Sequence, residues 1–418
     1  MKTIKSLYKI GHGPSSSHTM GPTNAAKYFK KLFPYADEFT VTLYGSLALT
    51  GRGHLTDKAI LETLAPVKTT INWNTTDTTI EHPNTMDFIA REKNKEIGCK
   101  RIYSIGGGSI KIKNETTKEV IPIDIYAESS TMQILEACRK NKITLYQYIK
   151  QHESESFWRH LNKVWQIMQQ AINKGLKSTD PLPGRLKLKR KAKILFDTSI
   201  QKLKSKHIDG NRHRLMAYAF AVSETNASGG IVVTAPTCGA CGILPAVLLY
   251  SKEQLKLNDQ KIIEGLAVAG LVGNVARTNG SIAGAEAGCQ AEVGVACAMA
   301  AAAFAYFLKL SNNQIFNTAV SALEHHLGLT CDPVLGYVQS PCIERNALAA
   351  IRAIDAADLI SLSAEGRIFN FDDIVETMLT TGRALNAGYR ETSTAGLADI
   401  YNKKINAKFK HKFDIKIS

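Results

Sequence analysis

Alternating hydrophobic and polar positions predict strands in the first part of the chain. Phe39–Tyr44 alternates as a half-buried strand does. The run Arg101–Ile105 leads into three glycines, after which Ile110 and Ile112 alternate with lysines. A further alternation places three isoleucines on one face: Ile121, Ile123 and Ile125. Helices are expected between these strands, at Thr56–Ala65 and Thr85–Gly98. This order of elements predicts a small α+β domain.

The period changes to that of helices after Ser130. We therefore place a domain boundary after residue 128, with an α+β domain at 1–128 and a larger all-α domain at 129–418. The turn at Pro181–Gly184 is read as a loop inside the second domain. Small residues dominate from residue 210 onward and allow helices to approach closely. The predicted helices there are 212–228, 243–251, 259–276, 290–309, 312–327, 343–361 and 371–384.

The composition of the 418 residues is that of an ordinary globular protein, with 44% hydrophobic and 21% charged residues. This excludes a disordered or collagen-like chain. The longest apolar run, Val293–Leu308, is rich in Ala and shorter than the roughly 20 residues that cross a bilayer. It predicts a buried core helix. The first residues lack the apolar stretch of a signal peptide, so we expect a cytoplasmic protein with no membrane association.

The net charge of +15 raises the question of an acidic partner such as nucleic acid. The distribution of this charge along the chain argues against an acidic partner. Residues 1–206 carry +16, residues 207–399 carry −6 and residues 400–418 carry +5, which sum to +15. No helix-turn-helix, zinc-finger or aromatic RNA-binding signature accompanies the basic residues. A solvated basic face is the preferred interpretation, and no nucleic-acid partner is expected.

A run of hydroxyl side chains lies between the Gly-Pro pairs of Gly13–Pro22, from which we expect a loop followed by a helix after Pro22. Hydroxyls and free amides near a helix N-terminus suit a carboxylate or a phosphate. The candidate anion-binding residues are Ser15, Ser16, Ser17 and Thr19, with His18 among them. The alternative is an ordinary Ser-rich helix cap.

Two further histidines lie in predicted turns of the first domain. In Gly45–His54 a strand is expected to run into a Gly-rich turn that presents the imidazole of His54. His82 stands before Pro83 and Asn84. Each of these histidines, taken alone, is more often structural than catalytic.

Eight cysteines in a cytosolic chain of this size do not indicate a disulfide framework. Cys238 and Cys241 form a Cys-x-x-Cys pair, which fits a redox pair, half a zinc site or a packed helix start. Cys289, Cys331 and Cys342 instead lie beside Gly or Pro, outside helix interiors. Three such thiols form an incomplete ligand set for a [4Fe–4S] cluster, which would leave one iron open as a Lewis acid.

In these residues the chain resembles the iron–sulfur L-serine dehydratases (L-serine ammonia-lyases). The likeness spans nearly the whole chain in order, which makes it specific. The segments that carry it are Gly13–Pro22, Ser104–Gly108, Leu182–Gly184, Asn226–Gly230, Ala235–Thr237, Gly284–Cys297, Glu324–Asn346 and Tyr389–Ser393.

The resemblance implies an N-terminal domain like the allosteric substrate-binding domain of some phosphoglycerate dehydrogenases, and a helical catalytic domain. It maps the cluster ligands onto Cys289, Cys331 and Cys342, and places His18 and His54 on the active-site side of the first domain. It implies a homodimer that deaminates L-serine to pyruvate and ammonia without pyridoxal phosphate. The iron would polarise the β-hydroxyl while a base removes the Cα proton. His54 and His18 are the favoured acid–base candidates.

This chain departs from the family pattern in three places. Some relatives carry a cysteine near the C-terminus that can occupy the open iron, whereas here no cysteine follows Cys342 and the tail is Lys-rich. Cys238 and His326 stand where many relatives carry Asn. Two other readings stay open. One is an amino-acid-sensing module with zinc or a redox pair at Cys238 and Cys241; the other is a pyridoxal-dependent deaminase.

Overall fold

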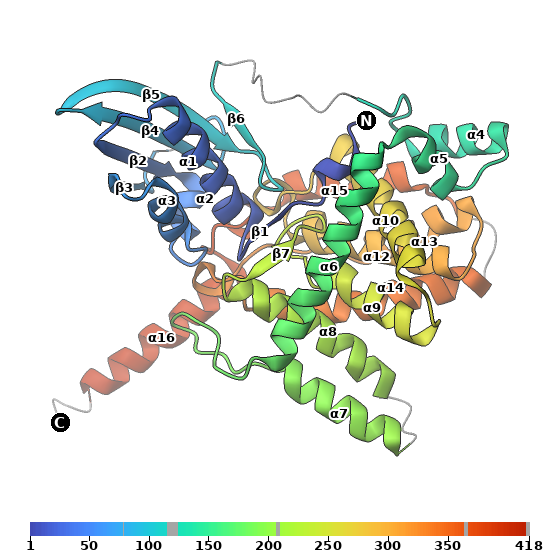
Figure 1. Cartoon of the computed structure of the whole chain (residues 1–418). Coiled ribbons are helices and arrows are strands. Elements are labelled where there is room, and N and C mark those ends of the chain that lie inside the picture. Colours follow the sequence, from blue (N-terminus) through green and yellow to red (C-terminus); the bar gives the residue numbers. More distant parts are fainter. Residues whose placement is uncertain (78, 115–123, 206–209, 363–366, 415–418) are drawn as a thin grey trace.

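The computed structural model covers residues 1–418 and describes 1–77, 79–114, 124–205, 210–362 and 367–414, with side chains described as far as residue 407. A five-stranded sheet with its helices lies beside a larger helical body (Figure 1). Apart from strands β1 and β7, described below, the regular elements of the helical body in the described residues are helices and helical turns. The expected fold class, an α+β region followed by an essentially all-helical one, is confirmed.

The sheet has the order β3-β2-β4-β5-β6, with β2 and β3 parallel and the other pairs antiparallel. Helices α1 and α3 pack against each other and contact its strands. The apolar face carries an aromatic cluster around Phe29, Phe39 and Phe88. The elements are α1 Gly21–Leu32, β2 Glu38–Tyr44, α2 Gly45–Thr50, α3 Thr56–Leu64, β3 Lys68–Asn74, β4 Thr85–Glu92, β5 Lys95–Ser104 and β6 Ile110–Ile112.

The helix predicted at Thr85–Gly98 is wrong, because this segment forms the β4–β5 hairpin. Lys93 and Asn94 both have positive φ, 51° and 66°, and form the two-residue turn that a tight hairpin needs. Met86, Phe88 and Ala90 are buried at every second position, which is the strand period. The expected alternation of Ile121, Ile123 and Ile125 falls mostly outside the described residues, and Ile125 itself lies in no strand.

The helical body surrounds α12, Val295–Phe307, whose residues are buried except for Tyr306. Its many alanines allow α9, α10, α13 and α14 to pack close to it. The segment Gln290–Phe307 has the length and hydropathy of a membrane span, but 94% of it is buried inside the protein, as expected for a core helix. The other helices are α4 Thr131–Asn141, α5 Leu145–His152, α6 Glu155–Lys177, α7 Ala192–Lys204, α8 Gly210–Ala227, α9 Ile243–Gln254, α10 Asp259–Asn279, α13 Asn312–Glu324, α14 Cys342–Leu362, α15 Phe371–Ala384 and α16 Gly396–Asp414.

All seven helices predicted beyond residue 210 are confirmed, and the expected loop at Pro181–Gly184 lies between α6 and α7. Two of the longer helices were not predicted, α7 and α16; the latter extends away from the body (Figure 1). The short helix α2 was not predicted either. Short helical segments occur at η1 Ile4–Ser6, η2 Ser16–Met20, α11 Gly284–Ala287, η3 Gln290–Gly294, η4 Val334–Gly336 and η5 Ala387–Tyr389.

The N-terminal segment joins the helical body before the chain enters the sheet. Ile4, Leu7 and Tyr8 belong to the large helical core, and the Tyr8 hydroxyl donates to the carbonyl of Leu266. Strand β1, Ile10–His12, pairs antiparallel with β7, Ile231–Val233, the one strand between α8 and α9. The boundary after residue 128 stays a prediction; the two regions meet where this segment turns toward the sheet.

Candidate active site

The segment that precedes α1 is helical, which corrects the expected loop. Ser15 is extended and caps the turn Ser16–Met20, with its Oγ accepting from the amide of His18 at 3.0 Å. Helix α1 continues directly from Gly21, since Pro22 needs no amide hydrogen bond in a first turn. All residues of the turn are buried. His18 is therefore fixed by a capped, buried turn.

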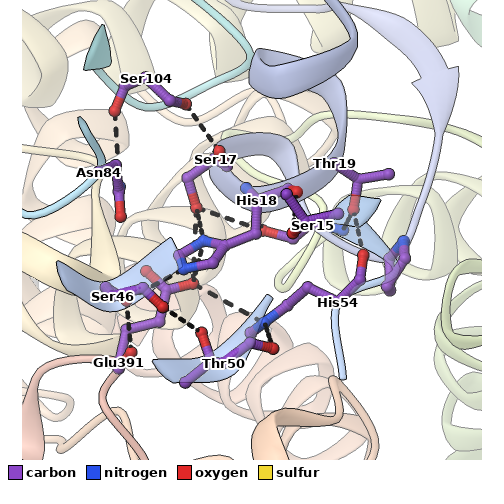
Figure 2. Close-up of polar contacts among 12 residues, drawn as sticks. Ser15, Ser17, His18, Thr19, Ser46, Thr50, His54, Asn84, Ser104 and Glu391 are labelled. Carbon is purple, nitrogen blue, oxygen red and sulfur yellow. Dashed lines mark hydrogen bonds and ion pairs between the residues drawn. The ribbon is translucent and has the colours of Figure 1, made fainter. Parts of the chain in front are cut away.

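The hydrogen bonds of His18 define its tautomer (Figure 2). The Ser46 hydroxyl donates to the carbonyl of Glu391 at 2.6 Å, so its oxygen accepts from His18 Nε2 at 3.0 Å. His18 Nδ1 then accepts from the Ser17 hydroxyl at 2.8 Å. Burial, followed by the neighbouring His54, lowers the pKa of His18 well below its ordinary value. The ring is a neutral imidazole with both nitrogens occupied.

His54 lies beside His18, with ring centroids 4.4 Å apart. The strand does not run straight into a turn as expected: helix α2 follows β2 directly, and His54 comes from the turn after α2. Its Nδ1 donates to the carbonyl of Thr50 at 3.0 Å, which leaves Nε2 as the unprotonated nitrogen. Burial lowers the pKa of His54 to about 4. At neutral pH Nε2 therefore offers a lone pair.

Glu391 joins the two histidines to the helical body, and sequence reasoning did not single it out. Its Oε1 lies 3.4 Å from His18 Nδ1, 3.9 Å from His54 Nε2 and 3.5 Å from the Ser17 hydroxyl (Figure 2). Its backbone has a φ of 59° and its amide donates to the carbonyl of Cys331 at 2.7 Å. Oε2 is buried without a partner among the described residues. The only signal was its place inside the Tyr389–Ser393 motif.

The three cysteines predicted as ligands are buried in this region, with exposed fractions of 3% to 8%. The ligand atoms of Cys289, Cys331 and Glu292 all lie within 4.8 Å of one another. Cys342 is the first residue of α14, and its thiol pKa is raised by burial and by the charge of Cys289. The expected position of these cysteines outside helix interiors is confirmed. Glu292 was not predicted.

The electrostatics of the cysteine group favour a bound cation. A hydrogen bond from the Cys331 thiol lowers the pKa of Cys289, and the charge of Arg345 adds to this effect. Burial raises the pKa of Glu292, and the negative charge of Glu391 raises it further. Burial and then Cys289 raise that of Glu391. Metal ligands are deprotonated thiols and carboxylates, and a cation bound here would offset the negative charge that burial disfavours in this pocket.

The four predicted anion-binding residues lie next to this group but differ in their hydrogen bonds. Thr19 Oγ1 donates to the carbonyl of His54 at 2.8 Å and accepts from the amide of Ser15. The Ser15 hydroxyl caps the turn. The Ser17 hydroxyl lies between His18 and Glu391. Ser16 is buried as the first residue of the turn. Two of the four hydroxyls therefore already stabilise the backbone.

The other candidate residues lie outside this group. Cys238 and Cys241 are buried before α9, and the Cys238 thiol contacts the sulfur of Met20 at 3.8 Å. Within the part of the chain that the structure describes, neither belongs to a group of three metal-ligating side chains. His82 Nδ1 accepts from the amide of Asn84 at 3.0 Å, so it stabilises a turn.

The amino-acid sequence is similar to family models and to known proteins over most of its length. The family model described as serine dehydratase beta chain matches residues 3–70, and that described as serine dehydratase alpha chain matches residues 114–398. The chain is 37% identical to L-serine dehydratase 2 of Escherichia coli, with 95% of this chain and 98% of that protein covered. It is 38% identical to the L-serine dehydratase of Haemophilus influenzae, with 95% and 99% covered, and 36% identical to that of Helicobacter pylori, with 95% and 98% covered.

Proposed function

The chain belongs to the serine dehydratase family, and on that premise we propose that it is an L-serine dehydratase that converts L-serine to pyruvate and ammonia. The observation that carries the proposal is the contact of Glu391 with both sides of the site. Its carboxylate faces His18 and His54, and its amide bonds the carbonyl of Cys331. Acid–base residues and metal-ligating residues are thus held at one buried centre.

We propose that Cys289, Cys331 and Cys342 hold a [4Fe–4S] cluster. The buried thiols, the lowered pKa of Cys289 and the neighbouring Arg345 support this ligand set. With three cysteine ligands, such a cluster would supply a Lewis acid for departure of the substrate hydroxyl. Glu292 lies beside these thiols and is positioned to accept or release a proton there.

The residues of this chain then perform the proton transfers. His54 Nε2 is unprotonated and is the proposed acceptor of the Cα proton, while Thr50 fixes the ring through Nδ1. His18 and Glu391 form the adjacent proton-carrying pair. Loss of the Cα proton and of the β-hydroxyl as water leaves aminoacrylate, which tautomerises to the imine and hydrolyses to pyruvate and ammonia.

The hydroxyl-rich turn is the proposed site of the substrate carboxylate. Ser15, Ser16, Ser17 and Thr19 all lie within one turn of His18. Of these, the Ser17 hydroxyl faces the histidine–glutamate group, so we assign it the most direct contact. The burial of the whole turn excludes water, which strengthens each hydrogen bond to a carboxylate.

We also propose that the enzyme acts as a homodimer in the cytoplasm. The dimer rests on the family resemblance. Light scattering on the purified protein tests the dimer, and cell fractionation tests the location.

Anaerobic purification followed by iron and sulfide assays tests the function directly, together with pyruvate formation from L-serine. We expect brown, oxygen-sensitive protein with about four irons per chain. A yellow, air-stable protein that loses activity on reduction with borohydride would instead indicate pyridoxal phosphate. Zinc in place of iron, with no turnover of L-serine, would favour the sensing module.

A further inference from the structure

A hollow lined in part by Arg345 contains none of the three cysteines in its lining and has no part in the proposed reaction. This α14 cavity has a volume of about 470 Å³, within the usual range for small-molecule sites. One face of α14 forms its wall, through Arg345, Leu348, Arg352 and Asp355, which follow one another at helical spacing. The opposite side comes from the end of α13, from η3 and from Arg212 of α8.

Cationic side chains outnumber acidic ones in the α14 cavity. Arg212, Arg345 and Arg352 line it together with a single carboxylate, Asp355. Asp355 lies 3.6 Å from Arg212 and 3.7 Å from Arg352, so one carboxylate is shared by two guanidiniums at distances too long for strong hydrogen bonds. Both guanidiniums therefore retain donors for a second anion.

Two imidazoles, His325 and His326, lie at the same wall. His326 Nδ1 donates to the carbonyl of Ala322 at 2.7 Å, so Nε2 of the neutral ring is an acceptor and the arginines supply the donors for an anion. Burial lowers the pKa of His326, and the charges of His325, Arg352 and Arg345 lower it further.

The rest of the lining is apolar, which decides the class of ligand. Val293, Leu329 and Leu348 line the cavity beside the arginines. Leu348 is 64% exposed, so an apolar side chain faces solvent at this cavity. A purely inorganic anion would leave these surfaces in contact with water. A carboxylate attached to a short branched hydrocarbon satisfies both the arginines and the apolar lining.

We propose that the α14 cavity is a binding site for a small organic anion, a carboxylate on a compact apolar body, separate from the site of the L-serine reaction. Arg345 lines this cavity and also lies beside the cysteines, because it donates to the carbonyl of Thr330 and lies 3.7 Å from Asp332, the neighbour of Cys331. His18, His54 and the hydroxyl-rich turn do not line the cavity.

Isothermal titration calorimetry of the anaerobically purified enzyme with isovalerate tests the site without recourse to turnover, so its failure and that of the proposed function are distinguishable. We expect one binding event per chain. Arg352→Gln should weaken it about tenfold or more, because a charge-assisted hydrogen bond is lost. Arg139→Gln, at an exposed arginine on α4, is the matched control and should bind as the wild type does.

A second variant tests the contact between the apolar part of the ligand and the cavity. Leu348→Ser should weaken isovalerate binding by several-fold while leaving the fold intact, since the side chain is mostly exposed. Inorganic phosphate should bind more weakly than isovalerate. Equal affinity for phosphate and isovalerate, or isovalerate binding that survives Arg352→Gln, would overturn the proposal, as would the absence of any binding heat.

Discussion

The two halves of the candidate site differ in how completely the protein satisfies them. On the side of the sheet, His18, Ser46 and Ser17 form a closed set of hydrogen bonds, and His54 is fixed through Thr50. On the side of the helical body, thiols and carboxylates lie close together. Burial raises the pKa of Glu292 and of Cys342, and the hydrogen bond to Cys289, followed by burial, raises that of Cys331.

This difference indicates that the histidine group is preorganised by the fold alone, whereas the proposed cluster would complete the cysteine group. Glu391 belongs to both, since its backbone pairs with Cys331 and its side chain faces the imidazoles. Changes on the two sides should therefore separate cofactor retention from proton transfer.

The largest effect is expected on the cysteine side. Cys331→Ser should lose most of the bound iron and essentially all pyruvate formation, because a hydroxyl replaces a ligand thiolate. Iron per chain and turnover of L-serine measure both losses. Cys99→Ser, at an exposed cysteine of β5, should keep both. A Cys331→Ser protein with full iron content would contradict the ligand assignment.

On the histidine side, iron content and turnover should respond differently to substitution. His54→Ala should retain iron but lose about 10²- to 10⁴-fold in kcat, the usual contribution of a general acid or base. The measurement is kcat on samples of matched iron content. Wild-type turnover in this variant would remove His54 from the mechanism, and loss of iron would show that the two halves are not independent.

The sequence predicted the helical body better than the details of the site. Long segments with apolar residues at helical spacing are recognised from the sequence, and the helix predicted at 371–384 coincides with α15. The hairpin at Thr85–Ser104 was missed because Arg91–Glu96 has the charged composition of a surface helix, and only the left-handed turn at Lys93 and Asn94 reverses the chain.

Single residues that meet through tertiary structure gave the weakest signal. The cysteines were found because Gly and Pro beside them marked positions outside helix interiors. Glu391 and Glu292 carry no such mark. Ser17 and Glu391 are 374 positions apart and meet only because the turn before α1 packs against the bridge between Cys331 and Arg390. A pairing of this kind depends on the packing of the two regions, which spacing along the chain does not report.

The pH dependence of stability should show that the histidine group is buried in its neutral form. His54 has a pKa of about 4 in the folded protein and about 6.5 when unfolded, so the unfolded chain binds more protons between these values. The stabilisation is complete above pH 6.5 and is lost as the pH falls toward 4. Between pH 6.5 and pH 4.5 this single group should cost about 2–3 kcal/mol. Urea unfolding at the two pH values measures it.

The control for this measurement is the difference between variants, because other groups also titrate in this range. His54→Gln should remove its share of the pH dependence, so the free energy of unfolding of this variant should change less between the two pH values than that of the wild type. Identical slopes in wild type and His54→Gln would mean that folding does not lower the pKa of His54.

The smallest effect on turnover is expected at Ser46, one of the residues through which the two halves are in contact. Ser46 donates to the Glu391 carbonyl and accepts from His18 Nε2, so Ser46→Ala leaves one buried donor and one buried acceptor without a partner. Each loss costs about 1–3 kcal/mol in a buried site. We expect a lower free energy of unfolding, near-normal iron content and a kcat reduced by about tenfold, because His18 loses its orientation but His54 keeps its own.

Ser46→Thr, which retains the hydroxyl, should restore most of the turnover. If Ser46→Ala instead lost iron as Cys331→Ser does, the histidine side would be supporting the cysteine side directly, and the separation between the two halves would fail.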